Sequence, residues 1–415
     1  MSKIEELIER LCPNGVEYKT IGEVATYRRG SFPQPYTNSS FYGGDGAMPF
    51  VQVADIEDNG FKLKEKTKQT ISKIAQPKSI YAPKGTVICS IQGTIGRVAI
   101  TQFDSYIDRT IAIFESFKIE INKRFFAYCI ELKFGIEKQF ARGSTLKTIT
   151  KEEFTKFRIP VPRLEVQCEI VHILDDFTLL SAELSAELKA RQKQYEYYLY
   201  KLISDSKKIT KNKLYELTIW DKKFNAVENY MQPNVKKYPT LLAVDLFNLE
   251  RENGNVFLLS TGGQRGWTTE EVAGDNISEG EVVTIPWGKS RPVQEVMKYY
   301  CGKFVTGDNR IATSNDIKKL NNKYLFYWMQ TQSERIDKFY RGSGIQHPNM
   351  RNVLTLEIEL PSIDEQKRIV SILDKFEKLC NDISQGLPAE IEARQKQYEY
   401  YRDKLLTFKE LKVNE

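Results

Sequence analysis

The chain has 415 residues, of which 41% are hydrophobic and 28% are charged, and its formal net charge is +6. This length predicts more than one domain, and the small basic excess is compatible with a nucleic-acid partner without requiring one. The six cysteines form no CxxC pair, and no run of eighteen apolar residues or signal-type apolar start occurs. We therefore expect no zinc site of thiolates, no disulfide framework and no membrane span, but a protein of the reducing cytoplasm.

The first segment, residues 1–160, shows short β-rich runs separated by turns, such as GTVICSIQ and GRVAITQF. Arginine and glutamine can each make two hydrogen bonds to a base edge, while serine, threonine and glycine-rich turns suit phosphates. For any one loop the alternative is ordinary solvated surface, and the RGS turn at 142–144 fits a purely structural role almost as well. The candidate nucleic-acid-binding residues of this segment are Arg28, Arg29, Gln92, Thr94, Arg97, Arg109, Arg142 and Ser144.

Residues 161–208 are predicted to form a long helix. Its apolar positions step by four and three, which is the seam of a coiled coil, and 40 residues of helix would span about 60 Å. A helix of this length with one apolar stripe needs a partner; the alternative is that the stripe packs on its own globular domain. The predicted seam residues are Ile170, Leu174, Phe177, Leu184, Leu188, Tyr195, Tyr198 and Leu202.

A second β-rich segment, residues 209–361, echoes the first at a few places. FFAYCIEL after Lys123-Arg124 resembles YLFYWMQT after Lys323, and IDRTIAI resembles GDNRIAT. Elsewhere the two segments barely match, so they are predicted to be two related but different domains. The candidate nucleic-acid-binding residues here are Gln264, Arg265, Lys289, Ser290, Arg291, Arg310, Arg341 and Ser343.

Residues 362–411 repeat the long helix. The block ARQKQYEYY occurs at Ala190–Tyr198 and again at Ala393–Tyr401, and the offset between the copies grows from 199 residues at the RGS turns to 203 at this block. Four extra residues therefore lie between Phe376 and Ala393, where Gly386 and Pro388 are expected to interrupt the helix. The predicted seam residues of this copy are Ile369, Leu373, Phe376, Ile391, Tyr398, Tyr401 and Leu405.

Catalytic chemistry is not indicated by the sequence. The two histidines, His172 and His347, lack the partners that a metal site or a catalytic triad requires. The GKS at Gly288–Ser290 lacks the first glycine of a phosphate loop, and no glycine-rich dinucleotide motif opens a helix. We expect no catalytic residue, no metal and no cofactor.

The order of domain, helix, domain and helix, with the entry PSIDEQKRIVSIL and the end ARQKQYEYYRDKLL, resembles the specificity subunit of type I restriction–modification systems. The resemblance implies an α+β fold of two β-rich target recognition domains joined by two long antiparallel coiled-coil helices, with an internal pseudo-two-fold repeat. It implies a non-catalytic subunit that reads a bipartite, asymmetric target in double-stranded DNA. It also implies methyltransferase subunits and a restriction (translocase) subunit as partners, which carry the methyl donor and ATP.

A different class of function explains the helices as well. A coiled-coil scaffold or inhibitor that binds only protein would need the seams, but it gives no reason for two dissimilar domains with Arg-, Gln- and Gly-rich loops. Steeply salt-dependent binding to duplex DNA separates the two hypotheses, because phosphate contacts release counterions.

Overall fold

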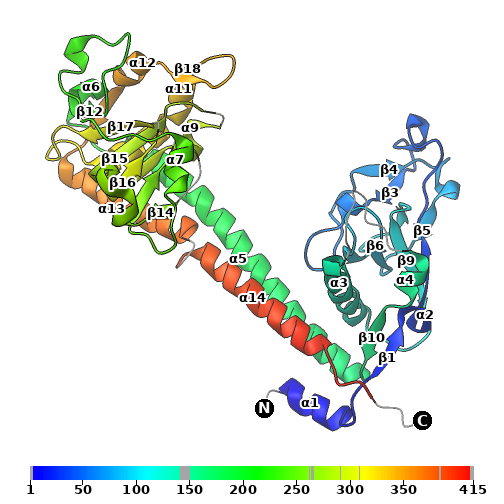
Figure 1. Ribbon diagram of the computed structural model, residues 1–415. Coiled ribbons are helices and arrows are strands. Elements are labelled where there is room, and N and C mark those ends of the chain that lie inside the picture. Colours follow the sequence, from blue (N-terminus) through cyan, green and yellow to red (C-terminus); the bar gives the residue numbers. More distant parts are fainter. Residues whose placement is uncertain are drawn as a thin grey trace. The chain divides into compact units, whose positions relative to one another are not determined.

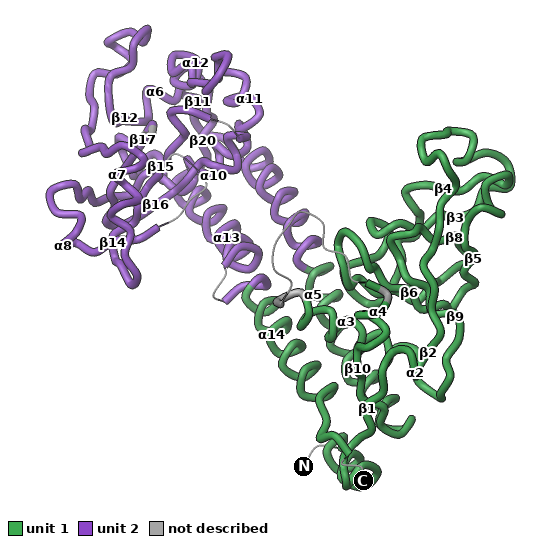
Figure 2. Tube along the Cα trace, turned by 45° about the vertical axis from the view of Figure 1, so that its right-hand side comes forward, with its two compact units in different colours: residues 1–187, 389–415 green, residues 188–388 purple. Residues whose placement is uncertain are grey.

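The computed structural model describes residues 3–140, 150–260, 262, 266–289, 291–307, 309–382 and 385–411. The chain divides into two compact units, residues 1–187 with 389–415 (unit 1) and residues 188–388 (unit 2), coloured separately in Figure 2. Each unit consists of a β-rich body and a pair of packed helix segments (Figure 1). The predicted α+β class with two β-rich bodies and an internal repeat is confirmed.

Two four-stranded sheets and a two-stranded ribbon form the body of unit 1. The strand orders are β2-β9-β6-β7, β4-β3-β8-β5 and β1-β10. The strands are β1 (Glu17–Thr20), β2 (Ala25–Arg29), β3 (Met48–Val51), β4 (Gln69–Ile71), β5 (Ile80–Ala82), β6 (Val87–Ser90), β7 (Val98–Ile100), β8 (Ser105–Ile107), β9 (Ile111–Phe117) and β10 (Arg158–Val161). The helices are α1 (Lys3–Leu11), α2 (Ile21–Val24), α3 (Lys123–Phe140) and α4 (Lys151–Thr155), with short 3-10 turns η1 (Ser39–Phe41), η2 (Val53–Asp55) and η3 (Gln76–Lys78).

A six-stranded sheet forms the centre of unit 2, in the order β12-β17-β15-β16-β13-β14, beside the ribbons β11-β20 and β18-β19. The strands are β11 (Thr210–Lys213), β12 (Thr218–Trp220), β13 (Val256–Leu259), β14 (Trp267–Thr268), β15 (Ser278–Pro286), β16 (Lys298–Thr306), β17 (Asn309–Ser314), β18 (Tyr340–Arg341), β19 (His347–Pro348) and β20 (Glu357–Leu360). The helices are α6 (Leu214–Leu217), α7 (Ala243–Asn248), α8 (Glu270–Ala273), α9 (Val293–Val296), α10 (Asn322–Thr331), α11 (Ser333–Asp337) and α12 (Met350–Leu354), with turns η4 (Asn229–Met231) and η5 (Gly274–Asn276).

One long helix, α5 (Leu164–Asp205), contributes its first part to unit 1 and its last part to unit 2. Within unit 1 it packs antiparallel to α14 (Leu387–Leu406), and within unit 2 it packs antiparallel to α13 (Ile363–Asn381) (Figure 1). The second helical copy ends at Asn381 and begins again at Leu387, so the predicted interruption is confirmed. The described residues that follow Leu406, 407–411, are not helical, and Glu410 forms a bridge to Val16 beside β1.

The aromatic helices α3 and α10 are the largest difference from the expected β-rich bodies. Their inner turns are buried almost all round: Phe125, Phe126 and Phe134 in α3 and Tyr324 in α10 have no exposed surface. A helix that is apolar on every side shows no amphipathic period. For this reason the sequence pattern pairs the two segments but does not predict either one as a helix.

No helix in the described part of the chain combines the length and the apolar character needed to cross a membrane.

Candidate nucleic-acid interface

Buried glutamines join each helix to its body. The side-chain oxygen of Gln167 in α5 accepts a hydrogen bond from the backbone N–H of Asn122 (2.8 Å), and its amide donates to the carbonyl of Pro162 (2.8 Å). In unit 2, Gln366 accepts from Asn321 (2.9 Å) and donates to Pro361 (3.0 Å). Both side chains are almost fully buried. Because both partners are backbone groups, the joint fixes the helix start against the body without depending on neighbouring side chains.

Acidic residues about two helical turns further along each helix make a second connection. Asp175 in α5 accepts hydrogen bonds from the hydroxyl of Tyr128 (2.7 Å) and from Arg124 (2.6 Å). Asp374 in α13 accepts from Tyr327 (2.6 Å) and pairs with Lys323 (2.9 Å). Burial is the main cause that raises the pKa of both tyrosines, and the nearby carboxylates add to it. These hydroxyls therefore remain protonated donors at neutral pH.

The seam between the helices is lined by the repeated aromatic residues. Phe177 stacks on Tyr401 in unit 1, and Tyr198 stacks on Phe376 in unit 2, each with ring centroids 5.5 Å apart and an interplanar angle of 23°. Leu174, Ile170, Leu373 and Ile369 are fully buried. The other predicted seam residues are buried or partly buried: Leu184, Leu188, Tyr195, Leu202, Ile391, Tyr398 and Leu405.

Sequence reasoning missed a second buried stripe on α5. Leu199 and Ile203 lie one position after Tyr198 and Leu202 and are more deeply buried, in the core of unit 2. Val166 and Val171 are their counterparts at the start of α5, in the core of unit 1. A helix that packs on both a partner helix and a globular body needs two adjacent apolar faces, and a heptad count finds only one.

In unit 1, three polar segments meet at one end of the sheet that contains β2 and β9. The N–H of Ile91 donates to the carbonyl of Thr110 (2.9 Å), and the N–H of Gly30 donates to Ile111 (2.9 Å). Arg29, exposed at the end of β2, donates to the side-chain oxygen of Gln92 (3.4 Å). Arg29 and Gln92, predicted from separate loops, are thus neighbours in the structure.

Arg109 belongs to the same region. Its guanidinium lies over the ring of Phe32, 4.8 Å from the centroid, and the side chain is exposed. The backbone is tightly packed here, because a Cβ on Gly30 would lie 2.3 Å from the carbonyl oxygen of Ile107. We define the unit 1 surface as Arg29, Phe32, Gln92 and Arg109.

The remaining described candidates of unit 1 do not belong to this surface. Arg28 is exposed and pairs with Glu115 (3.4 Å), and Thr94 is exposed in its loop. Arg97 donates to the carbonyl of Ile56 (3.1 Å) and pairs with Asp58 (2.5 Å), so its guanidinium joins two loops of the body. This geometry favours a structural role for Arg97.

In unit 2, Lys289 and Arg310 are drawn into the body. Lys289 forms an ion pair with Asp337 and lies over the ring of Tyr340 (4.9 Å). The guanidinium of Arg310 lies over Phe224 (5.2 Å) and within 6.0 Å of Trp287. Arg291, Arg341 and Ser343 are exposed. The predicted residues Arg142, Ser144, Gln264, Arg265 and Ser290 lie outside the described residues.

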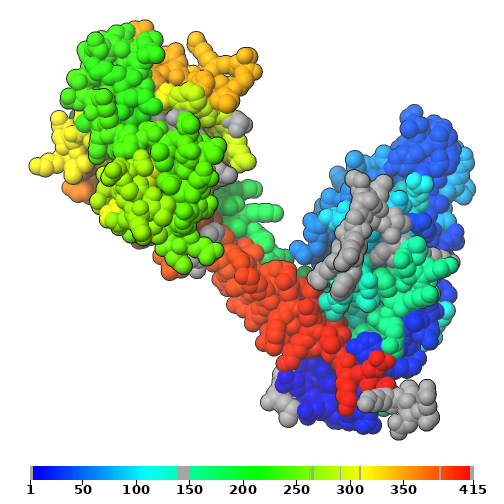
Figure 3. Space-filling view, in the orientation of Figure 1, coloured from blue at the N-terminus to red at the C-terminus, as the bar shows by residue number. Residues whose placement is uncertain are grey.

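The loop from β18 to β19 projects from unit 2, in orange beside the labels α12 and β18 in Figure 1 and in the same place in Figure 3. It carries Arg341 and Ser343, and its exposed Ile345 and His347 were not predicted as site residues. Trp287, 38% exposed, lies against His347. The sequence signal that could have identified Trp287 was an aromatic residue in a Gly-, Lys- and Arg-rich loop.

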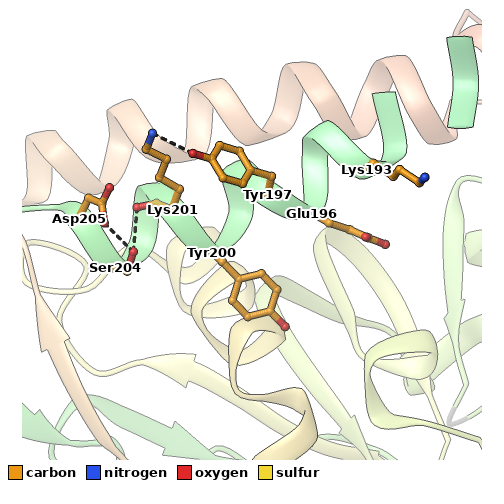
Figure 4. A pocket seen from close by; sticks show the side chains of 7 residues that line it. All are labelled: Lys193, Glu196, Tyr197, Tyr200, Lys201, Ser204 and Asp205. Atoms are coloured by element: carbon orange, nitrogen blue, oxygen red, sulfur yellow. Dashed lines mark hydrogen bonds between the residues drawn. The ribbon is translucent and has the colours of Figure 1, made fainter. Parts of the chain in front are cut away.

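The outward face of the last turns of α5 carries a shallow hollow, shown in Figure 4. It is lined by Lys193, Glu196, Tyr197, Tyr200, Lys201, Ser204 and Asp205. The ammonium of Lys201 donates to the hydroxyl of Tyr197 (3.0 Å). Tyr197 is 57% exposed, and its counterpart Tyr400 in α14 is 63% exposed. The repeated block thus turns one tyrosine into the seam and the preceding one toward solvent.

No group of three or more potential metal ligands occurs among the described residues. The hollow on α5 is open and lined by long, flexible side chains, so it lacks the enclosure of a small-molecule site.

The family model of the type I restriction modification DNA specificity domain matches residues 13–194 and 243–393. The chain is 30% identical over 313 residues to the type I restriction enzyme EcoR124I/EcoR124II specificity subunit of Escherichia coli, covering 69% of this chain and 72% of that one. A putative type I restriction enzyme specificity subunit of Haemophilus influenzae is 31% identical over 329 residues, covering 70% and 74%.

The fold is also that of a solved structure. The S subunit of a type I restriction-modification system from M. genitalium superposes with a TM-score of 0.56 at 12% identity, covering 94% of this chain and 96% of that one. The resemblance inferred from the helix motifs is confirmed. The chain therefore belongs to the family of type I restriction–modification DNA specificity subunits.

Proposed function

We propose that this chain is a non-catalytic DNA-reading subunit that acts in the cytoplasm. It recognises a bipartite, asymmetric target in double-stranded DNA, and it directs associated methyltransferase and restriction subunits to that target. Each unit reads one half of the target, and the helices set the spacer between the halves.

The observation that carries this proposal is the contrast between repeated joints and unrepeated surfaces. The Gln167 and Gln366 joints make the same backbone hydrogen bonds in both units. The surfaces differ: unit 1 presents an arginine–glutamine pair and an arginine over phenylalanine, whereas unit 2 presents a tryptophan–histidine pair. The two units are joined to their helices in the same way but present different surfaces. This arrangement suits the recognition of two different half-sites, just as the two subunits of a DNA-binding dimer each recognise one half-site.

The partners follow from the family and from the helix surfaces. The names of the relatives describe specificity subunits of restriction enzymes, which implies enzyme subunits that carry the chemistry. The exposed tyrosines Tyr197 and Tyr400 occupy the same position in the two repeats. Aromatic residues with an apolar body and a polar tip are enriched at protein interfaces. One methyltransferase subunit per repeat is the assembly that this surface favours.

The test is methylation mapping in a host that carries this chain with its methyltransferase subunits. We expect a split motif whose two halves differ. Replacing Arg29 and Gln92 together by alanine should relax one half and leave the other intact, because both residues belong to unit 1. A single continuous motif, or a perfect palindrome, contradicts the proposal.

The scaffold alternative is separated by binding to duplex DNA at several salt concentrations. A DNA reader that neutralises several phosphates loses affinity steeply between roughly 50 and 200 mM salt. A complex that binds its protein partners but shows no salt-dependent DNA affinity would support the scaffold instead.

A further inference from the structure

His347 and Trp287 form an ordered pair on the surface of unit 2. The two rings have centroids 4.2 Å apart with an interplanar angle of 52°, and Nδ1 of His347 lies 2.9 Å from the carbonyl oxygen of Trp287. A carbonyl oxygen only accepts hydrogen bonds, so Nδ1 carries the hydrogen and donates it. In the neutral ring, Nε2 is then a hydrogen-bond acceptor. Among the described residues Nε2 has no hydrogen-bond partner.

The two loops that carry this pair are anchored to the body and to each other. The N–H of Lys289 donates to the carbonyl of Gln346 (3.0 Å), and the ammonium of Lys289 pairs with Asp337. Tyr340, at the start of the projecting loop, donates its hydroxyl to the carbonyl of Pro286 (2.6 Å). The imidazole is therefore presented in a fixed direction before any ligand arrives, which lowers the entropy cost of binding.

Close packing between the loops maintains this geometry. A Cβ on Gly288 would lie 2.5 Å from Cγ2 of Ile345 and 3.6 Å from the ring of His347. A side chain at position 288 would therefore collide with the Ile345 side chain, and glycine avoids this contact. Ile345 itself is 65% exposed, so it leaves an apolar surface beside the imidazole.

The charged groups around the pair favour an anionic ligand. Arg341 lies directly opposite His347 in the β18–β19 register, and it is exposed. The guanidinium of Arg310, on the inner side of the pair, lies within 6.0 Å of the ring of Trp287, while Lys289 is neutralised by Asp337. An exposed arginine beside an exposed aromatic pair is a composition expected at a nucleic-acid interface.

We propose that His347, held by Trp287, is a base-reading residue of unit 2, an inference that rests on the proposed function. Its Nε2 accepts a hydrogen bond from an exocyclic amino group in the major groove, which is N6 of adenine or N4 of cytosine. These are the two donors that base pairs present there. Arg341 contacts the DNA backbone and contributes affinity without base preference.

The experiment compares complexes of the full chain with its methyltransferase subunits, using methylation mapping and binding to duplexes with each base changed in turn. His347→Ala should reduce discrimination at one base pair of one half-site by roughly ten-fold or more, which is the range for a lost base contact. The second half-site should be unchanged. His172→Ala is the matched control, because His172 is the chain's other histidine and lies exposed on α5 in unit 1.

Two further variants sharpen the test. His347→Arg replaces an acceptor by donors, so preference at the same position should shift toward guanine, whose groove edge carries acceptors. Arg341→Ala should weaken binding to all sequences and reduce the salt slope by about one phosphate contact, with the motif unchanged.

The outcomes distinguish this inference from the proposed function. If the wild-type complex shows no split motif, the proposed function fails. If the wild type shows one, and folded His347→Ala keeps full discrimination at every position, the base-reading role of His347 is wrong. A change in both half-sites would also overturn it, because His347 belongs to one unit only.

Discussion

Tyr327 donates its hydroxyl to the carboxylate of Asp374 at 2.6 Å, and the same hydroxyl reaches Glu377 at 2.9 Å. The ring has no exposed surface, and burial together with these carboxylates raises the pKa of Tyr327. The bond links α10 of the body to α13. It is thus one of the contacts that hold α13 against the β-rich body of unit 2.

Tyr327→Phe should lower the free energy of unfolding by about 1–3 kcal/mol, because the partly buried carboxylates of Asp374 and Glu377 lose this donor, although both keep their ion pair with Lys323. The midpoint of denaturant unfolding measures the change. Tyr400→Phe is the control, since Tyr400 is 63% exposed and should change the midpoint little. Equal midpoints for the two variants would show that the hydroxyl of Tyr327 contributes no stability.

Gln366 predicts a second stability effect. Gln366→Leu keeps the approximate volume but leaves the N–H of Asn321 and the carbonyls of Pro361 and Lys319 without this partner. Buried groups that lose their partner cost about 1–3 kcal/mol each, so the variant should be destabilised by at least this amount. The matched control is Gln395→Leu on the exposed face of α14, which should unfold at nearly the wild-type midpoint.

The two stacked ring pairs of the seam predict that the stacked residues contribute to stability in a coupled way. A double-mutant cycle with Phe376→Ala and Tyr198→Ala should show a coupling energy of about 0.5–1.5 kcal/mol, the range measured for aromatic pairs. The corresponding cycle on Phe177 and Tyr401 should give a similar value, because the two stacks have the same separation and angle. Strictly additive single-mutant effects would show that the rings do not interact.

Sequence reasoning predicted the joints better than the surfaces, for physical reasons. The two helix pairs pack through the same residues, which are Phe177, Phe376 and the ARQKQYEYY block. The sequence therefore repeats at these positions, and such a repeat can be recognised in a single sequence. Loop positions depend on which segments the fold brings together. Gln92 and Arg29 are 63 residues apart, and only the hydrogen bonds of the sheet make them neighbours.

His347 shows a further limit of prediction from sequence. The sequence shows no metal-binding or catalytic partner for His347, so it gives no reason to include this residue among the candidate nucleic-acid-binding residues. Its direction is set by the carbonyl of Trp287, a backbone group that lies 60 positions earlier in the sequence. Conversely, Arg97, a predicted nucleic-acid-binding candidate, donates to the carbonyl of Ile56 and pairs with the exposed Asp58, contacts that favour a structural role. Residue type suggested the chemistry, but tertiary contacts decide which side chains are available.

Asp221 predicts a dependence of stability on pH. Burial raises the pKa of this carboxyl, and the N–H of Ile311 and the nearby cations oppose the shift only in part. Between the ordinary aspartate value and the raised one, the folded state binds more protons than the unfolded state. The free energy of unfolding should therefore fall as the pH rises through this window. Asp221→Asn should flatten the curve, whereas Asp45→Asn at an exposed position should leave its slope unchanged.

The interruption between α13 and α14 predicts how the spacer is set. The second copy has four more residues than the first between its phenylalanine and the repeated block, and α5 is continuous where the second copy is broken. Deleting residues 383–386 restores the spacing of the first copy. Combined with Pro388→Ala, which removes the remaining helix breaker, the deletion should give one continuous helix and increase helical circular dichroism. In the complex with methyltransferase subunits, the deletion should change the spacer length of the methylated motif while both half-sites keep their sequences. Replacing the same four residues by alanine keeps the length and should keep the spacer. Altered half-site sequences in the deletion variant would mean that the helices do not act as a ruler.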